Sequence, residues 1–510
     1  MLSSIPHIAR TYGTPTYIYD FDRIAQNVAD FKNAFHARKS LLCYALKANS
    51  NLSLLRHLAQ MECGADCVSI NEVKRALIAG IPKYKIIYSG VGKSDSDLKE
   101  ALEEDILFIN VESVGELLRI EEIARGMGKV ARISVRVNPN IDAKTHPYIS
   151  TGLNENKFGV DLECAKKIFI HAKKSPFLSP IAVHFHIGSQ LLELSPIIES
   201  AKKIVELIRG LLALKIDIKF IDIGGGLGIA YNGEKIIDFY DYAQGILGAL
   251  KGLDLTIICE LGRRIVGDCG VLVAKVLYEK QNEFKRFCIV DAAMNDLVRP
   301  TLYGARHRIK HIPSDSCSSL NLSWGMQFTR RFPPCVVNGP QVLFPSKGQN
   351  AVQSHTAITS IEILHSQNLI KNKSARSANP RKSFCYFWLL PKVESSLPYR
   401  LQSTKQRNFA ESAPDSAPYF EKCDIVGPIC ESGDFLAKDI ALPPTNSGDL
   451  IAILDCGAYG FSMSSNYNSR LKCAEVALKN GECFLIRGRE SFAESIKNEE
   501  NCLKKTKGKL

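Results

Sequence analysis

Residues 220–228 read FIDIGGGLG, a short hydrophobic strand that runs directly into a row of glycines. Other hydrophobic runs end in a similar way, at HFHIGS (184–189), at ELGR (260–263) and at Lys47. Stretches with the apolar spacing of a helix, such as 201–214, separate them. Repeated strand–helix units with polar groups at the carboxyl ends of the strands predict an α/β fold with a TIM-type (β/α)8 barrel.

We expect this barrel to span residues 22–265. Beyond Arg263 the pattern changes to β-rich runs such as 271–278 and 450–454, which predict a second, mainly β domain that the strand at 16–19 joins. The remaining boundaries follow from this change of pattern. We assign residues 1–21, 266–311 and 420–490 to the β domain and residues 491–510 to a basic C-terminal tail.

Residues 312–419 interrupt this plan. The stretch is rich in serine, asparagine, glutamine and basic residues, and its hydrophobic periodicity is weak. This composition favours a large insertion that is mostly loop or disordered, with a small accessory fold as the alternative. The stretch contains no motif that carries chemistry, although its basic residues leave RNA binding as a second, weaker interpretation.

The net charge of +12 could indicate a nucleic-acid partner. Its distribution argues against one, because residues 312–419 alone contain a dozen Lys and Arg against five acidic residues. No apolar run approaches the length of a membrane span, so we expect no membrane partner. The remainder of the chain is only mildly basic, which suits an enzyme that binds phosphate and carboxylate groups.

The N-terminus and the cysteines predict a cytoplasmic location. Residues 1–10 lack the apolar core of a signal peptide. The sixteen cysteines show no short-domain spacing, and Cys63 and Cys67 have no second matching pair. We therefore expect free thiols in a reducing compartment and no metal site.

Seven segments occur in an order that resembles a known family. The chain resembles the fold-type III pyridoxal-phosphate decarboxylases, whose barrel is like that of alanine racemase, and among them the diaminopimelate decarboxylases. The resemblance covers roughly residues 10–310 and 420–490. The segments are YALKAN (44–49), HFHIGSQ (184–190), DIGGGLG (222–228), ELGR (260–263), RPTLY (299–303), GPICESGD (427–434) and GAYGFSMSSNYN (457–468).

The resemblance implies pyridoxal 5'-phosphate as the coenzyme, with Lys47 as the lysine that forms an imine with it. Position alone leaves an ordinary strand-end lysine as the alternative. Partial desolvation at the mouth of a strand would lower the pKa of Lys47 and keep a fraction as the free amine. Cys430 is implied as the proton donor after decarboxylation, and a packed core cysteine is its alternative.

The resemblance also implies how the coenzyme is held. Glycines let backbone N–H groups approach a phosphate closely, and Ser189 could add a hydroxyl donor, although a strand-to-helix turn and a helix N-cap are the alternatives. Glu260 would pair with the protonated ring nitrogen, unless it forms a salt bridge to Arg263 or Arg264. The predicted coenzyme-binding residues are Lys47, His186, Ser189, Gly224, Gly225, Gly226, Glu260, Gly262, Arg263 and Tyr459.

Three further polar residues carry open interpretations. His184 and His186 point to the same side of a strand, because side chains alternate along it. The family places the second histidine against the ring of the coenzyme, whereas we expect His184 to be a satisfied core histidine. Asp66 matches an acid that lines the site in related decarboxylases, and a turn or N-cap aspartate is its alternative.

The resemblance implies a clamp for a substrate with an amino-acid group at each end. Arg263 and Arg299 offer planar forks for a carboxylate, and Glu431 offers an anion for an ammonium group. Tyr303 and Tyr459 complete the predicted substrate-binding set. A solvated salt bridge is the alternative for either arginine, and a packed interface aromatic is the alternative for Tyr459.

The implied reaction is the decarboxylation of meso-diaminopimelate to L-lysine and CO2, the last step of lysine biosynthesis. Family members build this site across a homodimer, with the cysteine segment supplied by the neighbouring subunit. Leu261 replaces the proline of relatives, a change that we expect to matter little. The alternatives are a decarboxylase of another basic amino acid or carboxylated polyamine, and a binding-only relative inactivated by the insertion at 312–419.

Overall fold

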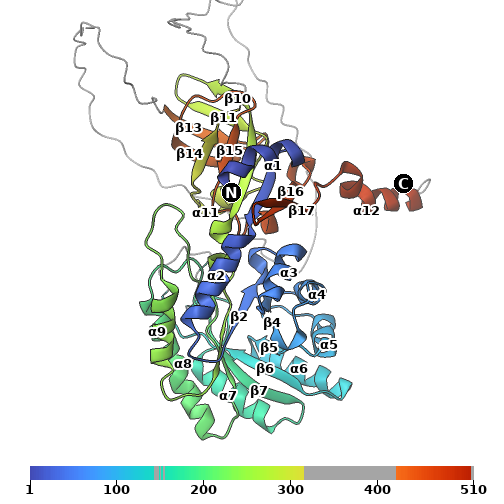
Figure 1. Ribbon diagram of the computed structural model, residues 1–510. Helices are drawn as coiled ribbons and strands as arrows, with labels where there is room; N and C mark the ends of the chain where they lie inside the picture. The colour runs from blue at the N-terminus through green and yellow to red at the C-terminus, as the bar shows by residue number, and fades with distance from the viewer. Residues whose placement is uncertain (143–148, 150, 153–154, 315–420, 507–510) are drawn as a thin grey trace, which may run out of the picture. The chain divides into compact units, whose positions relative to one another are not determined.

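Eight parallel strands close into a barrel, in which each strand pairs with the next and the last pairs with the first (Figure 1). Leu41 of the first strand lies opposite Ile258 of the last, which completes the ring. The predicted (β/α)8 barrel is therefore confirmed. The strands are β2 (Ser40–Ala45), β3 (Gly64–Cys67), β4 (Ile86–Tyr88), β5 (Phe108–Val111), β6 (Ala131–Arg136), β7 (Leu178–His184), β8 (Phe220–Asp222) and β9 (Thr256–Cys259).

The computed structural model describes residues 1–142, 149, 151–152, 155–314 and 421–506. Residues 315–419 of the predicted insertion lie outside the described residues, as do the irregular structure and the RNA-binding role considered for them.

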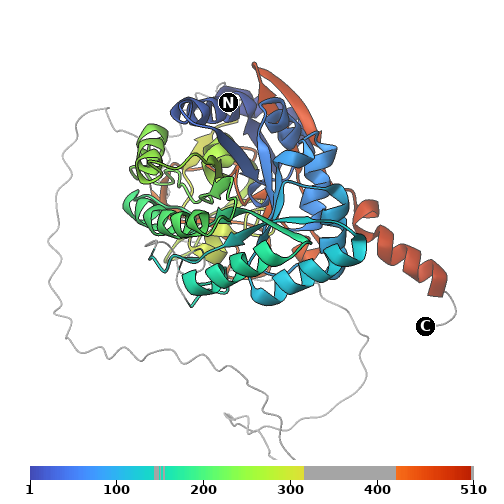
Figure 2. The ribbon, with the colours of Figure 1, turned by 90° about the horizontal axis from the view of Figure 1, so that it is seen from below.

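Helices surround the barrel, as Figure 2 shows from below. Polar caps begin most of them; the Ser94 side chain, for example, accepts a hydrogen bond from the backbone of Asp97 in a capping box. Their apolar faces pack on the strands, and the helix predicted at 201–214 corresponds to α8. They are α2 (Phe21–Ala34), α3 (Leu52–Gln60), α4 (Ile70–Ile78), α5 (Asp95–Glu104), α6 (Val114–Met127), α7 (Leu162–Lys174), α8 (Ser195–Ala213) and α9 (Phe239–Ala249).

The second domain is a mainly β structure, as expected. β1 (Thr16–Asp20) lies antiparallel to β10 (Gly270–Gln281) and parallel to β16 (Ala474–Lys479), so the N-terminal strand joins this domain as predicted. The strand order is β14-β13-β11-β10-β1-β16-β17, and β15 pairs with β10 and β12. The other strands are β11 (Arg286–Val290), β12 (Ile309–Ile312), β13 (Glu421–Val426), β14 (Phe435–Leu442), β15 (Leu450–Ile453) and β17 (Glu482–Arg487).

Three short helical segments carry polar residues to the mouth of the barrel. The turn η2 (Leu46–Ala48) follows β2 and contains Lys47, while α10 (Arg263–Val266) follows β9. The helix α11 (Arg299–Tyr303) follows β11 and begins with a buried arginine. These three turns place side chains of both domains at the carboxyl ends of the barrel strands.

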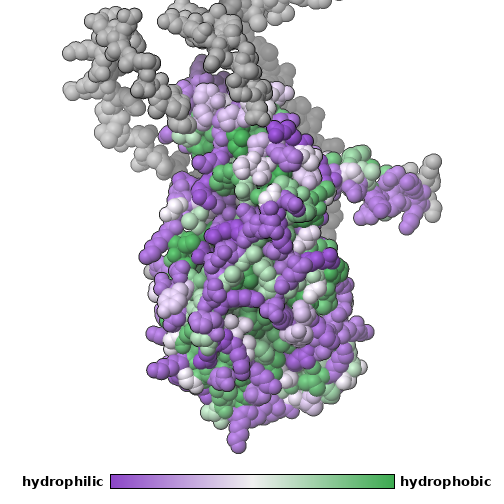
Figure 3. Space-filling view, viewed as in Figure 1, coloured by the Kyte–Doolittle hydropathy of each residue, from purple (hydrophilic) through white to green (hydrophobic). Residues whose placement is uncertain are grey.

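Two terminal helices complete the described fold. α1 (Ile5–Tyr12) buries Ile5 and Ile8 against the β domain, whereas α12 (Phe492–Thr506), within the predicted tail, buries no residue. Figure 3 shows hydrophilic side chains over most of α12 and a mixed surface over the barrel. Of the helices in the described ranges, none has the length and apolar character needed to cross a membrane.

Candidate active site

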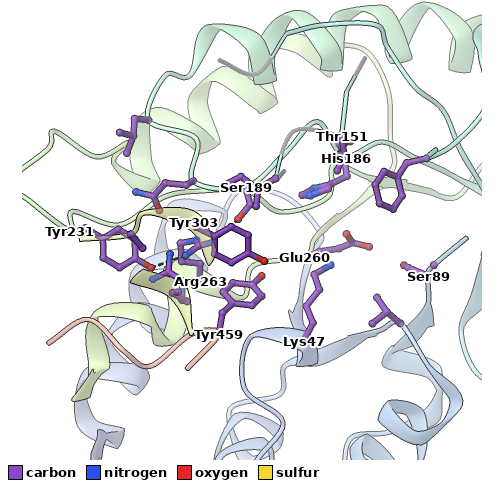
Figure 4. Close-up of a pocket in the computed structure, with 18 of the residues that line it drawn as sticks. Lys47, Ser89, Thr151, His186, Ser189, Tyr231, Glu260, Arg263, Tyr303 and Tyr459 are labelled. Atoms are coloured by element: carbon purple, nitrogen blue, oxygen red, sulfur yellow. Dashed lines mark hydrogen bonds between the residues drawn. The ribbon is translucent and has the colours of Figure 1, made fainter. Parts of the chain in front are cut away.

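A cavity of about 750 Å³ opens where the barrel strands end (Figure 4). It receives side chains from η2, from the segments after β7 and β9, from α11 and from the loop after β15. Most of the predicted site residues meet here. Those that line the cavity are Lys47, His186, Ser189, Glu260, Arg263, Arg299, Tyr303 and Tyr459.

Lys47 forms an ion pair with a fully buried carboxylate. Its Nζ lies 3.2 Å from Oδ2 of Asp66, at the end of β3. Burial opposes the charge of Lys47, but the attraction of Asp66 and then of Tyr459 outweighs it and raises the pKa of the lysine. The prediction that desolvation lowers this pKa is therefore wrong. Asp66 is also neither a turn residue nor an N-cap, because Ser69 caps the next helix.

Glu260 is a buried carboxylate among the residues that line the cavity. Its Oε2 lies 3.4 Å from Nε2 of His184, and its buried Oε1 has no hydrogen-bond partner among the described residues. Burial alone would raise the pKa of Glu260, but His184 and Lys47 outweigh it and lower the pKa, which favours the carboxylate. A buried anion with a free oxygen needs a cationic donor. The alternative of a salt bridge to Arg263 or Arg264 is wrong, since the described ion pair is with His184.

His184 and Asp222 lie next to the Glu260 carboxylate. The polar atoms of His184, Asp222 and Glu260 lie within 4.8 Å of one another. Burial and the charge of Glu260 raise the pKa of Asp222 well above its ordinary value, so Asp222 holds a proton where Glu260 does not. His184 is buried as expected, and its Nε2 is paired with Glu260, while its Nδ1 has no hydrogen-bond partner among the described residues.

The glycines after β8 make room for close backbone contacts. A side chain at Gly225 would place its Cβ 2.1 Å from the carbonyl oxygen of Glu260. The N–H of Gly225 donates to Nδ1 of His186 at 3.1 Å, and burial lowers the pKa of His186 well below its ordinary value, which keeps this nitrogen an acceptor. Gly224 and Gly226 have positive φ of 64° and 105°. The glycine segment therefore contacts Glu260 and His186, two of the residues that line the cavity.

Gly262 has a packing role. A Cβ at this position would lie 2.9 Å from the Cβ of Ala48 and 3.1 Å from that of Ala45. Only glycine lets the segment after β9 approach the turn that carries Lys47 so closely. Its predicted part in coenzyme binding stays a prediction.

Arg263 connects Ser189 and Tyr231 across the cavity. Its Nη2 donates to Oγ of Ser189 at 3.0 Å, and its Nη1 donates to the hydroxyl of Tyr231 at 2.7 Å (Figure 4). Its guanidinium lies 4.8 Å from the ring centre of Tyr459. Tyr459 itself has a positive φ of 57°, and its N–H donates to the carbonyl of Ala48. Ser189 does not cap a helix, since α8 begins only at Ser195.

Cys430 and Glu431 lie apart from this cavity. Both are exposed in the loop between β13 and β14, so the alternative of a packed core cysteine is wrong. The Glu431 carboxylate accepts a hydrogen bond from the hydroxyl of Tyr467 at 3.0 Å, and the backbone N–H of Cys430 donates to Asn468 at 3.3 Å. Neither residue is among those that line the cavity within the described chain. Their predicted roles stay predictions.

Several polar residues at or near the site escape the sequence analysis, among them Asp222, Tyr231 and His307. Asp222 enters that analysis only as part of a strand, although a carboxylate directly before a glycine run is a usable signal. Tyr231 follows the same glycine segment, and His307 follows the RPTLY segment. A lone tyrosine or histidine carries no signal of its contacts, so no pattern in the sequence could have identified them.

The residues present fit pyridoxal 5'-phosphate. Glu260, which the structure favours as a carboxylate, suits a protonated pyridine nitrogen, and Lys47 suits the aldehyde. Ser189 and Arg263 line the cavity and supply hydroxyl and cationic groups that suit a phosphate, whereas the N–H groups of Gly224 and Gly225 donate to Asp222 and His186. The predicted part of the glycines in phosphate binding stays a prediction. The Nε of Arg263 is buried and has no hydrogen-bond partner among the described residues, which also suits the binding of an anion.

Comparison with known proteins agrees with this chemistry. The family "Pyridoxal-dependent decarboxylase, pyridoxal binding domain" matches residues 21–267, and "Pyridoxal-dependent decarboxylase, C-terminal sheet domain" matches residues 395–457. The second match begins inside the predicted insertion, so the boundary at residue 419 stays a prediction.

Individual relatives are similar over almost the whole chain. Diaminopimelate decarboxylase of Helicobacter pylori is 47% identical, covering 97% of this chain and 98% of that protein; that of Campylobacter jejuni is 46% identical, covering 98% of each. The crystal structure of the Helicobacter pylori enzyme complexed with L-lysine has a TM-score of 0.76 at 45% identity, covering 98% of this chain and 100% of that one. The chain belongs to the diaminopimelate decarboxylase family of pyridoxal-dependent decarboxylases.

Proposed function

We propose that the protein decarboxylates meso-diaminopimelate to L-lysine and CO2, the last step of lysine biosynthesis. The observation that carries this proposal is the single cavity that brings Lys47 and Glu260 together with two buried arginines, Arg263 and Arg299. The first pair suits the coenzyme, and the second suits a carboxylate far from the reacting carbon. The names of the relatives support the same substrate.

The residues divide the work between coenzyme and substrate. When bound, pyridoxal phosphate accepts the electrons released as CO2 leaves. Lys47 would hold the coenzyme through its amine. Glu260, held as a carboxylate by His184 and Lys47, would pair with the protonated ring nitrogen. His186 would lie against the ring, and Ser189 with the glycine segment would hold the phosphate.

We propose a homodimer in which the neighbouring subunit completes the site. Cys430 and Glu431 are exposed and do not line the cavity of their own chain. This exposure would allow them to enter the cavity of a neighbouring subunit. Cys430 would deliver the proton to the carbon that lost CO2, and Glu431 would bind the distal ammonium. All cysteines in the described ranges are free thiols, which supports a cytoplasmic location.

Release of labelled CO2 tests the proposed reaction. The purified protein is loaded with pyridoxal phosphate and offered meso-diaminopimelate, ornithine, arginine or carboxynorspermidine. We expect turnover of diaminopimelate, and none by Lys47→Ala. Preference for another substrate would replace the proposed one, and coenzyme absorbance without CO2 release from any substrate would make the chain a binding-only relative.

Mixing two inactive variants tests the shared site. Lys47→Ala and Cys430→Ala each leave one half of a site intact, so a mixed dimer contains one complete site. After subunits exchange, we expect an equal mixture to regain about a quarter of wild-type activity, since half of the dimers are mixed and each has one working site of two. A mixture as inactive as its components would contradict a site shared between subunits.

A further inference from the structure

Arg299 and Arg263 are buried cations, each 6% exposed, and neither forms an ion pair with a carboxylate in the described part of the chain. The pKa of Arg299 is lowered first by burial and also by the charge of Arg263, so the two cations repel each other. A buried charge is normally balanced by an opposite one. Here the protein holds both guanidinium groups with neutral partners instead.

His307 is one of these partners, and its hydrogen bonds fix its tautomer. Its Nδ1 lies 2.9 Å from the carbonyl oxygen of Leu454. A carbonyl can only accept, so Nδ1 carries the proton and Nε2 is a bare acceptor. This Nε2 receives Nη1–H of Arg299 at 3.1 Å. Burial and the charge of Arg299 lower the pKa of His307 to about 3, so the ring stays neutral and keeps its acceptor.

Tyr231 is the second partner and lies between the two arginines. Its ring centre is 4.8 Å from the guanidinium carbon of Arg299, and its hydroxyl accepts a hydrogen bond from Arg263 at 2.7 Å. The ring also packs edge-on against His307, with centres 5.3 Å apart. The face of an aromatic ring attracts a cation without neutralising it. Tyr231 therefore orients both arginines while leaving their charges available.

We propose that His307 and Tyr231 are positioning residues that select a substrate with a distal carboxylate. This inference rests on the proposed function. A carboxylate in place of either residue would pair with the arginines and cancel the charge that a ligand needs. Neutral acceptors fix the geometry in advance and reserve the charge for the ligand, so less rotational freedom is lost when the carboxylate binds.

Calorimetric titration of the coenzyme-loaded protein with L-lysine tests the inference directly, because L-lysine keeps the distal amino-acid group of diaminopimelate. His307→Leu removes the acceptor, whereas His307→Gln retains one. We expect His307→Leu to bind L-lysine about 10-fold or more weakly, and His307→Gln to recover most of the loss. The KM for diaminopimelate should rise in parallel, with kcat within about threefold of wild type.

Cadaverine, which lacks any carboxylate, is the control ligand. We expect wild type to prefer L-lysine over cadaverine, and His307→Leu to narrow that preference. Tyr231→Phe, which loses only the hydroxyl that holds Arg263, should narrow it as well and provides the test if His307→Leu does not fold. An unchanged preference in folded variants, or a loss that His307→Gln does not rescue, would overturn the inference. Failure of wild type to release CO2 from diaminopimelate would contradict the proposed function instead, because the titrations do not depend on turnover.

Discussion

Lys47, in the turn after β2, forms an ion pair with Asp66 of the neighbouring strand β3, with Nζ and Oδ2 separated by 3.2 Å and the carboxylate fully buried. Burial pushes the pKa of Lys47 down, and Asp66 contributes the largest opposing effect. The charge state of the lysine therefore depends most on Asp66, with Tyr459 and Glu260 acting in the same direction. Because a free amine is needed to attack the aldehyde, we expect this contact to set the pH range of coenzyme attachment.

Asp66→Asn removes that opposing charge, so we expect the pKa of Lys47 to fall and attachment to the apo-protein to reach its half-maximal rate at lower pH than in wild type. The pH dependence of the rise in coenzyme absorbance measures this. Asp105→Asn is the control, because Asp105 pairs with the exposed Lys83 at 3.3 Å, far from any imine chemistry. A pH profile that is the same in Asp66→Asn and wild type would contradict the prediction.

Glu260→Gln replaces the buried carboxylate with a neutral amide of the same shape. The side chain then lacks the negative charge that would keep the ring nitrogen of the coenzyme protonated. We therefore expect kcat to fall about 100-fold or more while the coenzyme still binds. Turnover and coenzyme absorbance measured on the same sample separate the two effects. Glu475→Gln, at a fully buried glutamate of the β domain bonded to Tyr19 and Arg487, should lower thermal stability instead. Equal kcat in Glu260→Gln and wild type would rule out this role.

Gly225→Ala introduces a Cβ 2.1 Å from the backbone oxygen of Glu260, a separation that requires the backbone to move. We expect the coenzyme to bind about 10-fold or more weakly, because the segments that hold its phosphate and its ring nitrogen are pushed apart. Gly210→Ala in α8 meets no atom within 4 Å and should be neutral or slightly stabilising. The dissociation constant for pyridoxal phosphate and the melting temperature of both variants decide the matter. A Gly225→Ala protein with wild-type affinity would show that the close approach is dispensable.

Asp296 gives the β domain a pH-dependent stability. Burial raises its pKa from 3.8 to about 6, against the hydrogen bond from Ala293 and the attraction of Arg470. Because the folded protein favours the protonated acid, the stability contributed by Asp296 is complete below about pH 4 and is lost as the pH rises through about 6. The difference corresponds to about 3 kcal/mol. Denaturant titrations measure the unfolding free energy of wild type and of Asp296→Asn at each pH. We expect wild type to lose unfolding free energy relative to Asp296→Asn as the pH rises from about 4 to about 6. Parallel curves would contradict the assignment.

The sequence alone determined the barrel and the identity of most residues at its mouth. Short strands that end in polar or glycine residues must place those residues at one edge, because the carboxyl ends of parallel strands meet there. Lys47 follows one such strand, Glu260 and Arg263 follow another, and the structure brings all three into one cavity. The domain change after Arg263 was likewise visible, since the hydrophobic periodicity changes from strand–helix units to consecutive strands.

Only the tertiary structure decided how those residues are charged and held. The pKa of Lys47 is raised rather than lowered because Asp66 lies beside it, and no spacing in the sequence encodes that distance. His307 obtains its tautomer from Leu454, 147 residues away, and only then becomes an acceptor for Arg299. Periodicity fixes which face of an element a side chain occupies, whereas electrostatic partners depend on distances that exist only after strands and loops from remote parts of the chain have packed together.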